Sequence, residues 1–230
     1  MNKKRKSKKI VFWLILIPSI LIVSYFAIGG YIAFSATVIE PLSNCSSTNT
    51  PQTFGSTYSD VKFPARGDNL MIGGWFIPNE EAESAIILVH GRNSTKQTAA
   101  TCTFPELGAA LNQAGFAVLM IDTRGHGDSE GKRYSFGYYE RRDVLGAVDF
   151  LLDKGFAPGK IGALGISNGS GAIIGAASED DAIGALVLDS TIADMGEVIR
   201  KVFVEETGLP VFFLNGADLM GRLLLGYSFL

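Results

Sequence analysis

The chain has 230 residues, of which 47% are hydrophobic and 19% are charged, with 27 glycines and 8 prolines. This composition excludes a disordered polar chain, a collagen-like repeat and a coiled coil. Six of the 20 basic residues fall in the first nine positions, which leaves 14 against 23 acidic residues and a net charge of about -9 on the rest of the chain. An acidic body argues against a nucleic-acid partner, because phosphate binding needs basic side chains.

Residues 10–34 contain no charged side chain and predict a transmembrane helix. A helix of this length spans roughly 37 Å, against about 30 Å for the hydrocarbon core of a bilayer. The basic segment 1–9 predicts a cytoplasmic N-terminus, so the sequence beyond the helix is expected outside the cell membrane. The alternative is a signal peptide cleaved near Ala33 and Ser35, but its apolar core is usually about 7–15 residues long. We therefore expect an uncleaved, single-pass anchor.

Residues 35–56 are rich in Ser, Thr, Asn and Pro and predict a linker between the membrane and the domain at 57–230. Cys45 lies in this linker and Cys102 in the domain. The two could pair on the oxidising side of a membrane, but sequence does not give their geometry, and two unrelated thiols are the favoured interpretation. Two cysteines alone do not make a structural zinc site, so no metal is expected.

Beyond residue 56, predicted strands alternate with predicted helices. Two edge strands joined as a hairpin are expected first, followed by buried apolar strands separated by amphipathic helices. In chain order the predicted strands are 57–63, 70–78, 85–90, 116–121, 160–166 and 185–189, and the predicted helices are 103–114, 138–152, a small-residue helix from Asn168, and 192–206. The pattern predicts the α/β class, with a mostly parallel, doubly wound sheet and helices on both faces.

Polar motifs follow three of these strands, at the sheet edge where such folds bind ligands. The strongest is Gly165-Ile166-Ser167-Asn168-Gly169, which fits G-x-S-x-G between a strand and a helix. A sharp strand-to-helix turn strains the serine backbone, and side chains at the two glycine positions would clash. A P-loop is excluded because no lysine follows. A dinucleotide fingerprint, with Asp189 ending the next strand, and a purely structural turn stay open as alternatives.

With these motifs in order, residues 57–230 resemble the α/β-hydrolase superfamily, in particular membrane-anchored, lysophospholipase-like and serine-aminopeptidase-like members. The turn at His90-Gly91-Arg92 is similar to the one that supplies an oxyanion-hole amide there, and Asp122–Gly131 is similar to the D-x-R-G-x-G-x-S turn. The resemblance implies that Ser167 is the nucleophile and that the backbone N–H groups of Arg92 and Asn168 form the oxyanion hole. Gly91, Gly165 and Gly169 are then the motif glycines.

The general base and the acid of a triad are harder to find. The family's histidine follows the last strand, but this sequence has only His90 and His126, both before Ser167. His90 is expected to form hydrogen bonds within its own turn, and His126 is a weak candidate for the base. Asp189 is a weak candidate for the acid, with capping of the next helix as the favoured alternative. Asp218 does not resemble the family's acid.

The last part of the sequence suggests why the base and the acid of the triad are not found. Residues 192–230 resemble the beginning of a cap, after which the family has two more strands that carry the acid and the histidine. We therefore expect a hydrolase that is incomplete at its C-terminus. A second membrane segment at 209–230 is the alternative, but Asp218 and Arg222 interrupt it.

The function expected from these features is membrane-anchored serine hydrolysis of a small-molecule or lipid ester through an acyl-enzyme on Ser167, weak or absent in this chain alone. A non-catalytic pseudo-hydrolase that binds or scaffolds is the second hypothesis. A fragment that does not fold stably is the third, because the missing strands would leave a sheet edge exposed. No cofactor is expected.

Overall fold

The computed structural model describes residues 2–40, 48–228 and 230. The chain divides into two compact units, one made of residues 1–37 and 194–230 and the other of residues 38–193. The larger unit, 38–193, carries the sheet and the predicted catalytic motifs.

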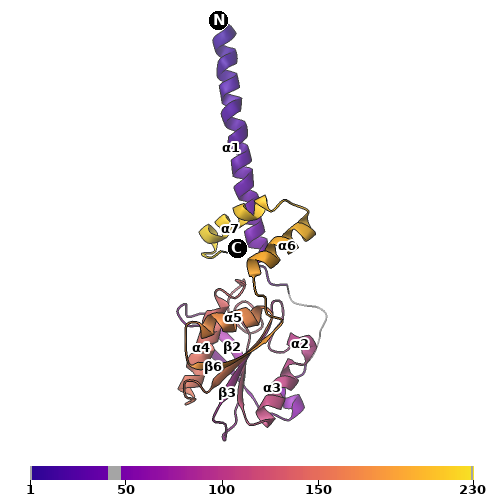
Figure 1. Cartoon of the computed structure of the whole chain (residues 1–230), viewed down its shortest axis with the longest axis vertical. Helices are drawn as coiled ribbons and strands as arrows, with labels where there is room; N and C mark the ends of the chain where they lie inside the picture. The colour runs from indigo at the N-terminus through magenta and orange to yellow at the C-terminus, as the bar shows by residue number, and fades with distance from the viewer. Residues whose placement is uncertain (1, 41–47, 229) are drawn as a thin grey trace. The chain divides into compact units, whose positions relative to one another are not determined.

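The sheet of the larger unit has six strands in the order β1-β2-β4-β3-β5-β6 (Figure 1). The strands β4, β3, β5 and β6 are parallel, while β1 and β2 are antiparallel to their neighbours. Their bounds are β1 (Ser59–Pro64), β2 (Met71–Ile77), β3 (Ala85–Val89), β4 (Ala117–Ile121), β5 (Ile161–Ile166) and β6 (Ile183–Asp189). The mostly parallel α/β sheet predicted from the sequence is confirmed.

Helices cover both faces of this sheet. On one face, α4 (Glu140–Asp153) and α5 (Asn168–Ala177) pack on a core that includes Ile87, Leu119 and Ile161. On the other face, α3 (Phe104–Gln113) packs on a second core around Trp75 and Met120. A short helix α2 (Ala99–Cys102) and the 3₁₀ helix η1 (Pro51–Phe54) complete the unit. Strands β3 and β4 are apolar throughout because both of their faces are buried.

The prediction that both of the first two strands are edge strands is wrong for β2. Gly74 of β2 pairs with Val61 of β1 on one side and with Ile121 of β4 on the other. A Cβ atom on Gly74 would lie 2.8 Å from the carbonyl oxygen of Met120, so this strand needs glycine where its neighbour approaches. Only β1 is an edge at this end of the sheet.

The preference for unrelated thiols is also wrong, because Cys102 is disulfide-bonded. The sequence contains one other cysteine, Cys45, which lies outside the described residues.

The smaller unit is helical and consists of α1 (Asn2–Ala36), α6 (Met195–Thr207) and α7 (Phe212–Leu224). Within α1, the segment Lys8–Ala36 is long and apolar enough to cross a membrane by length and composition. Helix α6 begins three residues later than predicted because Asp194 caps it: the Asp194 carboxylate accepts a hydrogen bond from the backbone N–H of Glu197 at 2.9 Å. The cap that the sequence assigned to Asp189 is therefore provided by Asp194.

Candidate active site

Ser167 lies in the turn between β5, which ends at Ile166, and α5, which begins at Asn168. Its backbone angles are φ 53° and ψ -115°, a conformation that residues other than glycine rarely adopt. Such a conformation costs on the order of 1–3 kcal/mol and persists where surrounding contacts hold it. One of those contacts is the hydrogen bond that the Ser167 N–H donates to the carbonyl oxygen of Asp189, at 2.8 Å.

The glycines of the motif leave room for this turn. A Cβ atom on Gly165 would lie 2.6 Å from the backbone of Gly169, and a Cβ atom on Gly169 would lie 2.5 Å from the carbonyl oxygen of Val89. A Cβ atom on Gly91 would lie 3.3 Å from the carbonyl oxygen of Ile166 and 3.4 Å from the Cβ atom of Ser167. The turn after β3 and the turn after β5 are therefore in direct contact.

Two backbone N–H groups at this contact have no acceptor among the described residues. One belongs to Arg92, which follows Gly91, and the other to Asn168, the first residue of α5. The N–H groups of a first helical turn have no partner within the helix and carry its positive dipole end. The Arg92 side chain stacks on the ring of Tyr134 at 4.5 Å, so it is the Arg92 backbone that belongs to the site. These are the two amides that the sequence assigned to an oxyanion hole.

His90 is fully engaged within the fold. Its Nδ1–H donates to the carbonyl oxygen of Gly91 at 2.7 Å, and its Nε2 accepts from the backbone N–H of Thr123 at 3.0 Å. Burial lowers the pKa of this imidazole below its ordinary value, which favours the neutral form. The ring joins the turns after β3 and β4.

His126 is engaged in the same way. Its Nε2 accepts from the backbone N–H of Asn93 at 3.2 Å, and its Nδ1–H donates to the carbonyl oxygen of Arg124 at 3.0 Å. Burial, together with the neighbouring His90, lowers the pKa of His126 to about 4. A base must have a free lone pair directed at the serine hydroxyl, and neither ring nitrogen of His126 has one. The described geometry therefore gives Ser167 no histidine base.

Asp189 ends β6 and is the strand partner of Ile166. Its carbonyl oxygen accepts from the Ser167 N–H, and its exposed carboxylate accepts from the Ser190 hydroxyl at 2.9 Å. With no histidine beside it, the carboxylate has no base to orient.

Four motif positions in the segment from Asp122 to Ser129 have structural roles. The Asp122 carboxylate accepts from the backbone N–H of Lys96 at 2.7 Å and from the Lys96 ammonium group at 2.6 Å. Gly127 is required because a Cβ atom there would lie 2.0 Å from this carboxylate. The Ser129 hydroxyl donates to the carbonyl oxygen of Asp122 at 2.6 Å. Arg124 forms a buried ion pair with Asp143 of α4, at 2.6 Å.

Sequence reasoning missed Lys96 and Asp143. Lys96 is 3% exposed and joins the β3 turn to Asp122 and, at 2.7 Å, to Asp128. A lysine in a polar loop normally points into water, so the residues around Lys96 give no indication that its side chain is buried. Asp143 is fully buried in the first turn of an amphipathic helix, where an acidic residue is ordinarily explained by the helix dipole.

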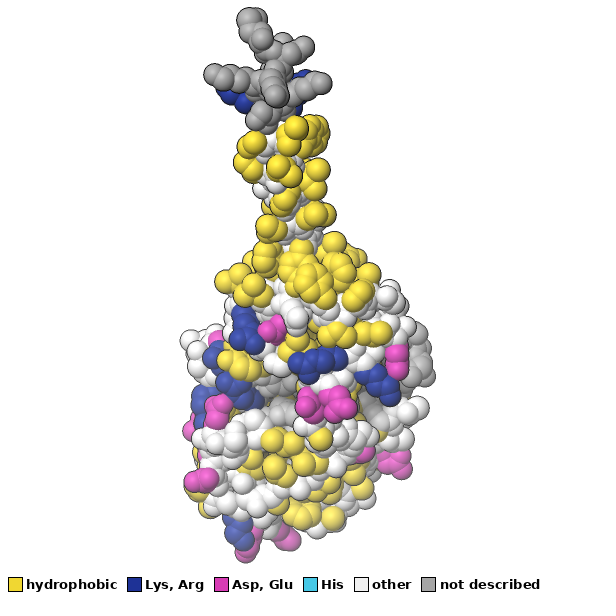
Figure 2. All heavy atoms as spheres, turned by 45° about the horizontal axis from the view of Figure 1, so that its top comes forward, with side chains coloured by type: hydrophobic (Ala, Val, Ile, Leu, Met, Phe, Trp, Pro, Cys, Tyr) yellow, Lys and Arg dark blue, Asp and Glu magenta, His cyan; other side chains and the backbone are white. Residues whose placement is uncertain are grey.

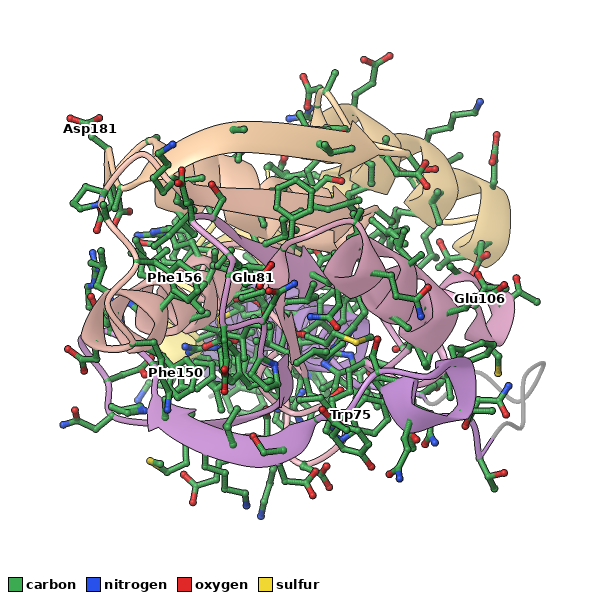
Figure 3. The ribbon with its side chains drawn as sticks, turned by 90° about the horizontal axis from the view of Figure 1, so that it is seen from below. Trp75, Glu81, Glu106, Phe150, Phe156 and Asp181 are labelled. Carbon is green, nitrogen blue, oxygen red and sulfur yellow. The ribbon has the colours of Figure 1, made fainter. Side chains whose placement is uncertain are left out.

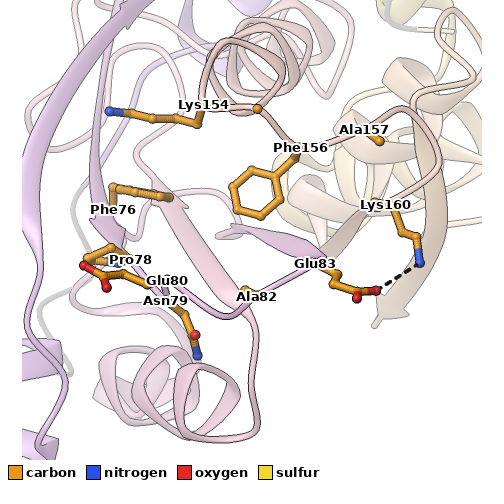
Figure 4. A pocket seen from close by; sticks show the side chains of 11 residues that line it. Phe76, Pro78, Asn79, Glu80, Ala82, Glu83, Lys154, Phe156, Ala157 and Lys160 are labelled. Atoms are coloured by element: carbon orange, nitrogen blue, oxygen red, sulfur yellow. Dashed lines mark ion pairs between the residues drawn. The ribbon is translucent and has the colours of Figure 1, made fainter.

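The cavity drawn in Figure 4 lies near the amino ends of the parallel strands β3 and β5, whereas Ser167 lies at the carboxyl end of β5. It has a volume of about 460 Å³ and is lined by residues such as Phe76, Glu83, Phe156 and Lys160. Lys160 precedes β5 and Ser167 follows it, so the full length of the strand separates them. Figure 3 looks toward this edge, with Glu81 and Phe156 on the loops before β3 and β5. This cavity is not the substrate pocket of Ser167.

Among the described residues, no group of three or more His, Cys, Asp or Glu side chains is arranged to hold a metal ion.

A strained serine at the carboxyl edge of a mostly parallel sheet, flanked by close-packed glycines, defines an α/β hydrolase. The sequence profile of the X-Pro dipeptidyl-peptidases (S15 family) matches residues 67–212. The chain belongs to that family.

Several known proteins resemble this chain. The esterase Pf2001 of Pyrococcus furiosus has a similar structure, with a TM-score of 0.63 and 26% identity over 79% of this chain and 69% of the esterase. The thiohydrolase aneE of Aspergillus aculeatus is 31% identical over 134 residues, which make up 57% of this chain and 41% of that protein. The uncharacterized protein YqkD of Bacillus subtilis is 33% identical over 99 residues, 43% of this chain and 31% of YqkD. The chain spans less than half the length of these two curated relatives.

Proposed function

We propose that Ser167 is the nucleophile of a serine hydrolase that cleaves carboxylic esters or thioesters. The observation that carries this proposal is the contact between the strained Ser167 turn and the turn that bears the free N–H of Arg92. The names of the esterase and the thiohydrolase that this chain resembles support the substrate class.

In the proposed reaction, the Ser167 Oγ attacks the carbonyl carbon and its proton passes to a base. The N–H groups of Arg92 and Asn168 stabilise the oxyanion, and a single donor of this kind is typically worth about 3–4 kcal/mol. Collapse of the tetrahedral intermediate releases the alcohol or thiol, which takes the proton. Water then hydrolyses the acyl-serine, and the acid is released.

Neither histidine of the sequence serves as the base in this scheme, because both are engaged elsewhere. A serine without its base retains only a small part of its catalytic power. An added small base such as imidazole is expected to replace the missing group in part.

The experiment is covalent labelling with a fluorophosphonate, read by peptide mass spectrometry. In this reaction the serine oxygen bonds to phosphorus, fluoride leaves and the base takes the proton. We expect slow labelling at Ser167 that imidazole accelerates, no labelling at this position in Ser167→Ala, and unchanged labelling in Ser178→Ala, which removes an exposed hydroxyl of the residue after α5. Labelling spread over other serines, with no effect of imidazole, would contradict the proposal.

The engaged histidines also favour a second function, that of a pseudo-hydrolase which binds an acyl ligand without cleaving it. Saturable binding of an ester that Ser167→Ala leaves unchanged, together with no labelling of Ser167, would support this function over the first.

We also propose that α1 anchors the chain in the cell membrane with the larger unit on the outside. Its apolar segment Lys8–Ala36 and the basic residues before it support this topology. The disulfide at Cys102 supports an oxidising compartment for the larger unit. In intact cells, added protease should digest residues 38–193; complete protection until the membrane is opened would contradict the topology.

A further inference from the structure

Helix α7 packs directly on α1 through glycine. A Cβ atom on Gly29 would lie 2.6 Å from the backbone of Gly216, and one on Gly216 would lie 2.8 Å from the ring of Tyr25. The Tyr25 hydroxyl donates to the carbonyl oxygen of Phe212 at 2.9 Å, and the two rings lie 4.6 Å apart. Close approach of two backbones at small residues is the way helices pack within membranes. Helix α7 is thus fixed to α1 with no layer of side chains between them at the glycine pair.

The length of α1 places this contact at the level of the bilayer. The apolar run begins at Ile10, after Lys9. About 20 residues are needed to cross a hydrocarbon core of about 30 Å, which takes the span to the region of Gly29. The part of α1 before the contact, from Ile10 to Val23, covers only roughly 21 Å. The turns that touch α7, at Tyr25 and Gly29, are therefore needed to complete the span.

The outward surface of α7 is apolar as well. Phe212 is 59% exposed, Leu223 is 70% exposed and Leu224 is 61% exposed. Figure 2 shows hydrophobic side chains along α1 that continue onto the apolar surface at its base. An apolar surface attached to a membrane helix is ordinarily covered by the same lipid.

The charges of α7 are neutralised against each other. The Arg222 Nε–H donates to the Asp218 carboxylate at 2.9 Å, and the Ser228 hydroxyl donates to the same carboxylate at 2.6 Å. Asp218 is 9% exposed. Pairing lowers the cost of bringing such groups to a membrane surface. With 13 residues, α7 is roughly 20 Å long and too short to cross the bilayer itself.

We propose that α7 is an interfacial membrane helix that lies in the outer boundary between head groups and acyl chains, with Phe212, Leu223 and Leu224 in contact with lipid. The proposal rests on the proposed membrane anchor and is independent of the proposed hydrolysis. The partner of this surface is the phospholipid bilayer that α1 crosses.

The test measures the depth of a fluorophore in proteoliposomes of the full chain. Three variants, Leu223→Cys, Ile20→Cys and Asp181→Cys, each carry an environment-sensitive dye on the new cysteine. All three positions are exposed. Labelling is done without reductant because Cys102 is disulfide-bonded, and the unsubstituted chain provides the background. The lipids carry a doxyl quencher either near the head group or at the middle of the acyl chain.

We expect the dye at Leu223 to emit at shorter wavelength than the dye at Asp181 and to be quenched mainly by the head-group-proximal doxyl. The dye at Ile20 should be quenched mainly by the mid-chain doxyl, and the dye at Asp181 by neither. If Ile20 is quenched and Leu223 is not, the interfacial helix is refuted while the anchor stands. A blue shift at Leu223 without doxyl quenching would mean that protein, such as a second copy, covers α7, which also refutes the proposal. Without quenching at Ile20, the anchor itself fails.

Discussion

The backbone N–H of Ser167 donates a hydrogen bond to the carbonyl oxygen of Asp189, at 2.8 Å. The Ser170 hydroxyl, which donates to the carbonyl oxygen of Gly165 at 2.6 Å, also lies 3.0 Å from the same Asp189 oxygen. Asp189 thus holds the serine turn through its carbonyl oxygen. This contact involves the main chain only and does not need the Asp189 carboxylate. The triad role of Asp189 stays a prediction, whereas its carbonyl oxygen helps to maintain the strained φ of Ser167.

Replacing Gly169 by alanine should destabilise the larger unit. The new Cβ atom would lie 2.5 Å from the carbonyl oxygen of Val89 and 2.6 Å from that of His90, both of which are backbone atoms. Overpacking of this kind typically costs about 1–3 kcal/mol, measured as the free energy of unfolding in urea. Gly171→Ala is the matched control because a Cβ atom there meets nothing within 4 Å. In a helix that change should be neutral or stabilise by up to about 1 kcal/mol. Equal effects of the two substitutions would contradict the packing described.

Replacing Lys96 by methionine should cost about 3–5 kcal/mol of unfolding free energy, because it leaves the Asp122 carboxylate buried without its cation. Asp122 is fully buried, and the ammonium group lies 2.6 Å from it. The double variant Lys96→Met with Asp122→Asn should recover part of that loss. Lys132→Met, at an exposed position, should stay within about 0.5 kcal/mol of the parent. A Lys96→Met variant as stable as Lys132→Met would show that the ion pair is not buried in solution.

The pH dependence of stability should report the buried state of His126. Burial lowers its pKa to about 4 from 6.5, so the unfolded chain binds a proton in this interval that the folded chain does not. Stability contributed by the neutral ring is therefore lost as the pH falls below 6.5, by about 2 kcal/mol at about pH 5.

The comparison with His126→Gln isolates this contribution. The amide of glutamine has an acceptor and a donor for the partners of the ring but does not titrate. Burial raises the pKa of Asp143 to about 7, which changes stability in the opposite sense over the same interval but is common to both proteins. The unfolding free energies of the parent and the variant, measured in urea near pH 7.5 and near pH 5, should diverge as the pH falls. A constant difference would mean that His126 is exposed to solvent in the folded state.

The strands of the sheet were predicted well from the sequence because each strand is marked by a local pattern of neighbouring residues. Apolar runs such as 85–90 and 116–121 end at polar or glycine-rich turns, and these boundaries are determined by neighbouring residues. The G-x-S-x-G turn was predictable for the same reason, since a Cβ atom on Gly165 would clash with the backbone of Gly169, only four residues later.

Long-range pairing carries no such local signal. Gly74 is next to Met120, and Lys96 is next to Asp122, only after the chain has folded. One of the two hydrogen bonds that engage His126 is likewise non-local, because its donor is the backbone N–H of Asn93, 33 residues earlier in the chain. Such non-local contacts leave neither histidine free to act as the base.

The most direct test of the central claim measures turnover of a p-nitrophenyl ester by the purified 230-residue chain, with and without imidazole, beside Ser167→Ala. The expected rate without imidazole is close to that of Ser167→Ala, because neither histidine can activate the serine. Added imidazole should raise the rate of the parent above that of Ser167→Ala at every concentration. Turnover at rates typical of esterases without imidazole, dependent on Ser167, would contradict this account and would make His126 the base.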